Sequence, residues 1–198
     1  MKYVKQLSIG AIAAMAVLAM TASSASATEL YSGLTTLKAG TVISATLSGT
    51  ATLTTTEGTV LVKCTGGSIA GKTSNTGSST ETVKGTVAAA DLTWSNCSEP
   101  TSTLAGGNLE IHHAGVGING TLTGSGFEVT VDTTVFGSCV FTLAAGTDLG
   151  TLTGSTSSNA TMDINAAVTR KSGLCPGTER WVATYTVTSP TTLHVTTS

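Results

Sequence analysis

The sequence predicts an all-β protein: an antiparallel β-sandwich, or a barrel-like relative of it, that forms a single domain after an N-terminal signal helix. Apolar and polar residues alternate with a period of two along most of the chain, which is typical of strands with one face on the core and one in water. The chain contains 23 glycines and many threonines, while charged residues make up only 10% of it. Threonine favours strands, and glycine favours turns and bulges.

Residues 1–27 have the features of a secretory signal peptide. Lys2 and Lys5 give a positive start, residues 9–20 form an apolar core, and the small residues 25–27 precede a cleavage site. This apolar core is too short to span a bilayer. We therefore expect a secreted protein, extracellular or at the cell surface. Its mature part, residues 28–198, then has no membrane insertion.

Three segments show the strand alternation most clearly. Phe127, Val129 and Val131 alternate with polar residues, and the same pattern continues over residues 162–168 and 181–187. Glycine and proline clusters separate such segments and predict turns. We expect roughly ten to thirteen short strands in a sandwich or barrel. Shorter alternating runs lie at residues 41–47, 59–64, 81–87, 109–113 and 193–196.

Four cysteines follow the signal peptide: Cys64, Cys97, Cys139 and Cys175. An even number of cysteines in an exported chain predicts two disulfide bonds. Since no two of them have the close spacing of a structural zinc site, we expect no metal here. Three pairings are possible, and we favour Cys64–Cys97 with Cys139–Cys175.

An internal repeat supports this pairing. Residues 40–64 align without a gap on residues 115–139, with nine identical positions out of 25. About three identities are expected by chance in so biased a composition. Two related halves, about 40–97 and 115–175, are the simplest interpretation, and chance similarity of composition is the alternative.

The charge balance excludes some classes of partner. Without Lys2 and Lys5, the chain has seven basic and eleven acidic residues. Nucleic acids and anionic membranes both require a basic surface, so neither is an expected partner.

No motif in the chain predicts catalysis or a cofactor. His112 and His113 are adjacent, but successive side chains in a strand point to opposite faces, so the pair cannot chelate one ion. His194 is expected on a solvent-facing side of a strand. Nucleophile-elbow and dinucleotide-binding motifs are missing, and the acidic residues are scattered. We predict no catalytic residues, no cofactor and no metal.

Three aromatic residues allow a binding alternative. Trp94, Trp181 and Tyr185 could together form a platform for sugars. Because Trp181 and Tyr185 share one face with Ala183 and Val187, we favour core packing for them instead. Trp94 is placed to pack near the bridge at Cys97. The ligand-binding residues remain unassigned at this stage.

Three segments carry a resemblance to a known family: LEIHHAG, GTDLGTLTGSTSSNATMDINA and CPGTERWVATYTVTSPTTLHV, at residues 109–115, 146–166 and 175–195. Over nearly the whole mature chain, the sequence resembles an uncharacterised family of secreted, disulfide-containing, β-rich proteins of soil actinobacteria. Since that family has no assigned activity, the resemblance implies only export, a bacterial source and the cysteine framework.

We therefore predict a structural or interaction protein without catalytic activity, secreted or at the cell surface. The alternative is an extracellular ligand- or carbohydrate-binding module. Self-association or a cell-surface partner is possible for the first class. One hypothetical route is the segment at residues 29–40, which precedes the repeat and would act as an edge strand able to pair with a neighbouring molecule. The simpler expectation is an ordinary first strand within its own domain.

Overall fold

The computed structural model describes residues 28–197, so the predicted signal peptide lies outside the described residues. In this part the chain forms seventeen β-strands and one short 3-10 helix at Ala89–Asp91. All strand pairings are antiparallel within the described sheets. The all-β antiparallel prediction is confirmed, with more strands than the ten to thirteen expected; two of the seventeen, β2 and β6, are only two residues long.

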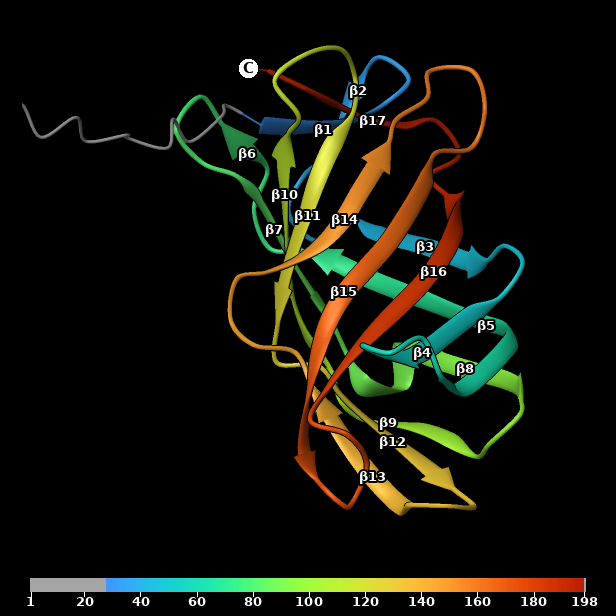
Figure 1. The fold of residues 1–198 in the computed structure, drawn as a ribbon. Coiled ribbons are helices and arrows are strands. Elements are labelled where there is room, and N and C mark those ends of the chain that lie inside the picture. Colours follow the sequence, from blue (N-terminus) through green and yellow to red (C-terminus); the bar gives the residue numbers. More distant parts are fainter. Residues whose placement is uncertain (1–27, 198) are drawn as a thin grey trace, which may run out of the picture.

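Eight of these strands close into a barrel (Figure 1). Closure results because β16 pairs with β15 on one side and with β3 on the other. Of the two predicted forms, the structure therefore has the barrel. The barrel strands in spatial order are β3 (Val42–Leu47), β5 (Val60–Thr73), β7 (Val83–Val87), β10 (Gly107–His113), β11 (Gly120–Ser125), β14 (Thr147–Thr153), β15 (Thr161–Ser172) and β16 (Thr178–Ser189).

A small second sheet lies across one end of this barrel, which we call the capped end (Figure 1). Its central strand β1 (Thr28–Ser32) pairs with the other three strands. Leu30 of β1 is completely buried. The N-terminal segment is therefore an ordinary strand of its own domain, held on both sides by its own chain. The other strands of this sheet are β2 (Thr35–Thr36), β6 (Gly77–Ser78) and β17 (Leu193–Thr196).

The other end of the barrel is lengthened by five more strands, and we call it the extended end (Figure 1). There β4 continues the line of β3 between β16 and β5, while β8 pairs with β5. On the opposite side β13 pairs with β15, β12 with β13, and β9 with β12. These strands are β4 (Ala51–Thr55), β8 (Leu92–Cys97), β9 (Thr101–Ala105), β12 (Glu128–Thr133) and β13 (Gly137–Thr142).

Strands β8 and β9 meet through side chains rather than through a backbone ladder. Trp94 Nε1 donates a hydrogen bond to Thr103 Oγ1 at 3.0 Å, and Thr103 Oγ1 donates to the Leu92 carbonyl oxygen at 2.7 Å. Among the pairings of the described strands, none joins β8 to β9. We call this contact line the β8–β9 seam.

Both disulfides join the cysteines in the predicted pairs. Cys64–Cys97 links directly opposed positions of β5 and β8, and Cys139–Cys175 links β13 to the segment that precedes β16. Two disulfides indicate an oxidising environment.

Across residues 28–197, no helix has the length and apolar character that a membrane span requires.

The two segments of the predicted repeat pair differently in space. In residues 40–64, β3 and β4 both pair with β5. In residues 115–139, β12 pairs with β13, but β11 pairs with β10 and β14. The two-halves interpretation therefore stays a prediction from sequence.

Candidate functional site

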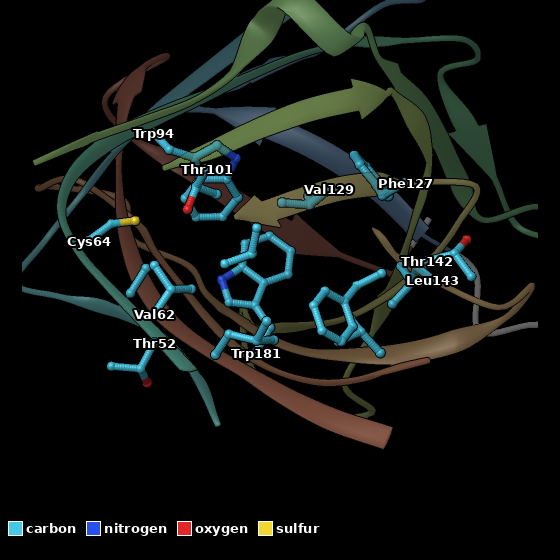
Figure 2. A pocket seen from close by; sticks show the side chains of 15 residues that line it. Thr52, Val62, Cys64, Trp94, Thr101, Phe127, Val129, Thr142, Leu143 and Trp181 are labelled. Carbon is cyan, nitrogen blue, oxygen red and sulfur yellow. The ribbon is translucent and has the colours of Figure 1, made fainter. Parts of the chain in front are cut away.

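The extended end encloses an apolar cavity of about 50 Å³. Side chains from the added strands of the extended end and from β5, β15 and β16 of the barrel converge on it, and Figure 2 shows Trp181 near its centre. Apart from three threonines, every lining residue is apolar. We call it the extended-end cavity. The lining residues used below are Leu53, Trp94, Phe127, Phe141, Val168 and Trp181.

Two tryptophans bring indole N–H groups to this cavity wall. The rings of Trp94 and Trp181 meet edge to face, with centroids 5.4 Å apart and an interplanar angle of 63°. The N–H of Trp94 is bound by Thr103 across the β8–β9 seam. Trp181 Nε1, in contrast, is buried without a hydrogen-bond partner among the described residues. The cavity therefore has one free donor in an apolar surrounding.

Phe127 closes the cavity towards the middle of the barrel. Its ring lies against Gly107, where a Cβ would clash with both the ring and the Ser125 carbonyl oxygen. Only glycine allows this approach, so Gly107 of β10 fixes the position of a side chain that precedes β12.

Two further cavities follow the extended-end cavity along the barrel. A middle cavity of about 20 Å³ shares Phe127 and Trp181 with it. A third cavity of about 50 Å³, nearer the capped end, shares Ile69, Leu109 and Met162 with the middle one. The interior is thus a row of apolar spaces separated by single side chains.

Unpartnered polar atoms concentrate on one strand of this interior. In the described part of the chain, four residues have buried side-chain polar atoms without a hydrogen-bond partner: Thr130, Glu179, Trp181 and Tyr185. Three of the four lie on the inward face of β16. Native proteins leave few such groups unsatisfied, and each one calls for a specific explanation.

Glu179 is the most unusual of them. It is only 1% exposed, and both of its carboxyl oxygens lack a partner. Its neighbours across the sheet are Thr55 on β4 and Val168 on β15. Burial, assisted by the nearby charge of Glu57, raises the pKa of Glu179 to about 7. The carboxyl group can therefore change its charge near neutral pH.

Tyr185 lies on the same face of β16, towards the middle cavity. It is 1% exposed, and burial raises the pKa of its hydroxyl group above the ordinary value. The hydroxyl group therefore keeps its proton and remains a hydrogen-bond donor. Trp181 and Tyr185 point inward, as the core-packing prediction expected, and together with Trp94 they do not form the alternative exposed platform for sugars.

The histidine pair lies at the opposite end of β10, with its side chains on opposite faces as predicted. His113 is buried, accepts a hydrogen bond from the Gly115 N–H, and contacts the Gly117 carbonyl oxygen at 3.0 Å through Nε2. His112 is half-buried and lies 3.8 Å from Glu110. In residues 28–197, no cluster of three or more His, Cys, Asp or Glu side chains could hold a metal ion.

The prediction for His194 was wrong. Its side chain is 6% exposed rather than solvent-facing, and its ring stacks on Tyr31 at 5.7 Å. The alternation rule fails there because the segment at Gly154 lies against His194 and covers the face that would otherwise meet water.

Sequence reasoning did not identify Glu179 as a site residue. The signal that could have found it is position: Glu179 precedes Trp181 by two residues and so shares its inward face. No family model matches this chain, and neither a curated protein nor a solved structure shows detectable similarity to it.

Proposed function

We propose that this protein is a non-catalytic extracellular binding module that takes a small, mainly apolar molecule into the extended-end cavity. The observation that carries the proposal is the unpartnered N–H of Trp181 in an apolar cavity. A buried donor without a partner costs about 1–3 kcal/mol. A ligand that fills the cavity and accepts this hydrogen bond would remove that cost.

The chemistry of the walls favours an apolar ligand over a carbohydrate. A sugar needs several polar partners, because each buried hydroxyl group without one is unfavourable. The cavity offers aliphatic and aromatic side chains, three threonines and one free indole N–H. This is the composition expected for a pocket that binds an apolar molecule and orients it by a single hydrogen bond.

The predicted signal peptide and the two disulfides support an extracellular place of action.

The β8–β9 seam is the proposed route by which a ligand reaches the cavity. Trp94 on β8 and Thr101 on β9 both line the cavity, and two side-chain hydrogen bonds join these strands across the seam. Opening the seam therefore breaks no backbone ladder.

A fluorescence titration with the neutral dye N-phenyl-1-naphthylamine tests this function. The dye becomes strongly fluorescent in apolar surroundings, and we expect saturable binding with one site per molecule. Val129→Phe, which fills the cavity, should weaken binding at least tenfold. Val135→Phe is the matched control, because Val135 is 79% exposed and lies outside the cavity lining.

Circular dichroism must first show that both variants keep the β-fold, since overfilling a core costs about 1–3 kcal/mol. A dye that does not bind the parent protein would contradict the proposed function. So would binding that the Val129 substitution leaves unchanged.

The structural or interaction role predicted from the sequence is the second proposal. One observation favours it: β9 ends the larger sheet, so its side towards β8 has no backbone ladder, and Leu104 of β9 is 54% exposed. An unpaired strand side is a surface to which another strand can add. Light scattering after size-exclusion chromatography tests this role. Oligomers that Leu104→Lys dissociates would support it, and a monomer at all concentrations would contradict it.

A further inference from the structure

Glu179 is an unbalanced negative charge beside the extended-end cavity. The ion pairs among residues 28–197 are Lys84–Glu110, His112–Glu110 and Lys171–Glu128, and none includes Glu179. Two of its sheet neighbours line the cavity: Val168 directly across the β15–β16 ladder, and Trp181 two residues along β16. Glu179 itself is not among the lining residues, and along β16 its backbone is about one pleat, or roughly 7 Å, from that of Trp181.

The charged groups around Glu179 do not compensate it. Glu57, in the turn after β4, adds a second negative charge. Arg170 lies two residues from Val168 on the same face of β15, but its Nη1 donates to the Cys175 carbonyl oxygen. Arg180 follows Glu179 on the outward face and binds Asn165. Neither arginine forms an ion pair with Glu179 among the described residues, and the charge that shifts the Glu179 pKa is the negative one of Glu57.

The aromatic residues of the cavity complement a cation as well. Trp94, Trp181, Phe127 and Phe141 all contribute to its wall. Aromatic faces attract ammonium groups, most strongly when the contact is shielded from water. An apolar cavity with an aromatic wall and an adjacent carboxylate matches a molecule with an apolar body and one positive charge.

We propose that the extended-end cavity and Glu179 together bind a lipophilic amine: its ammonium group pairs with the Glu179 carboxylate, and its apolar body lies against Trp181 in the cavity. This inference rests on the proposed binding function and specifies its ligand class. Beyond Phe127 lies the middle cavity of about 20 Å³, and a movement of the Phe127 ring would let the apolar body extend into it along the barrel.

The pH dependence follows from the ionisation of Glu179. With a pKa of about 7, the carboxylate fraction rises from about one-tenth at pH 6 to about nine-tenths at pH 8. An alkylamine, like the lysine side chain with its pKa of about 10.4, stays protonated over this range. Hydrogen bonds from Thr56 and the backbone lower the pKa of Glu57, so it stays ionised throughout. Amine affinity should therefore increase about tenfold from pH 6 to pH 8, while the affinity of a neutral ligand should not change.

Calorimetric titration with 1-octylamine, 1-octanol and octanoate, each below its micelle-forming concentration, tests the inference, because each has eight carbons and the head groups are cationic, neutral and anionic, respectively. At pH 8 we expect octylamine to bind at least tenfold more tightly than octanol, and octanoate to bind most weakly. Glu179→Gln should reduce octylamine affinity to that of octanol and leave octanol affinity within about twofold. Glu57→Gln, in the adjacent exposed turn, is the matched control and should keep most of the preference.

Equal affinities for the three ligands would overturn the inference and leave the binding function standing. So would an amine preference that persists in Glu179→Gln, or one without pH dependence. The parent protein alone decides the head-group and pH comparisons, so the inference stays testable even if Glu179→Gln does not fold. Failure of all three ligands and of the naphthylamine dye to bind would overturn both proposals.

Discussion

The two ends of the barrel bury polar groups in opposite ways. At the capped end, both ring nitrogens of His113 have partners, and its backbone N–H donates to Thr28 Oγ1 at 3.0 Å. At the extended end, the polar atoms of Glu179 and Trp181 are equally buried but have no partner. Both ends use the same kind of strand and the same apolar packing. The two ends therefore differ in whether their buried polar groups have partners.

This contrast separates structural from functional burial. A buried polar group with all partners in place stabilises one arrangement of the chain, as at His113. A buried polar group without partners reduces stability and is retained where a ligand or a proton change provides the compensation. Under the proposed function, the capped end contributes to the stability of the fold and the extended end binds the ligand.

The largest expected effect concerns the disulfides, both of which belong to the extended end. Cys64→Ser with Cys97→Ser opens a loop of 33 residues and should lower the free energy of unfolding by about 3–4 kcal/mol. Urea denaturation of the parent and the variant measures the loss. Peptide mapping without reduction checks the pairing itself, and a Cys64–Cys139 or Cys64–Cys175 peptide would contradict it.

A smaller effect is expected from the charge of Glu179. Its pKa is raised from 4.5 to about 7 in the folded protein, so the folded state binds the proton more tightly than the unfolded state does. This contribution is fully present below pH 4.5 and is lost as the pH rises through 7. The free energy of unfolding should therefore fall by up to about 3 kcal/mol over this range.

Urea denaturation of the parent and of Glu179→Gln at pH 4.5, 6 and 8 measures this change. The difference between the two proteins isolates the contribution of Glu179 from that of other titrating groups. If that difference were independent of pH, the carboxyl group would not be the unpaired group described above.

At the capped end, His113→Ala should lower stability without affecting binding. It removes two hydrogen bonds, so we expect the free energy of unfolding to fall by about 2 kcal/mol with no change in dye affinity.

Zinc should not raise the melting temperature of the parent, because His112 and His113 face opposite sides of β10. An increase of several degrees with zinc that His112→Ala/His113→Ala abolishes would show that these residues do bind metal.

The smallest expected effect on stability is at the β8–β9 seam. Thr103→Val removes both side-chain hydrogen bonds across the seam and should cost about 1 kcal/mol. If ligands enter there, the variant should bind and release the naphthylamine dye faster in stopped-flow measurements. Unchanged rates would place the access route elsewhere.

Sequence periodicity predicted the side-chain orientations that follow from the alternation of residues along a single strand. The inward face from Trp181 to Val187 and the opposite orientations of His112 and His113 are of this kind. The choice between sandwich and barrel was not predictable, because closure depends on the register between β3 and β16, which shifts at Val187. His194 was misplaced for a similar reason, since a distant segment covers it.

The cavity was also beyond prediction from sequence. It exists only because Trp94, Phe127 and Trp181, from distant parts of the chain, converge at one end of the barrel. For Glu179 the strand position was readable, but its charge argued for solvent exposure. Only the closure of the barrel around it produces a buried carboxyl group without a partner.

The central claim is that the Trp181 N–H donates a hydrogen bond to a ligand bound in the extended-end cavity. The chain has two tryptophans, so the indole N–H region of an NMR spectrum should contain two signals, which Trp181→Phe assigns. On titration with 1-octanol, the account predicts a large downfield shift of the Trp181 signal as its N–H gains an acceptor, and a smaller change at Trp94. A saturating titration that leaves the Trp181 signal in place would contradict the claim.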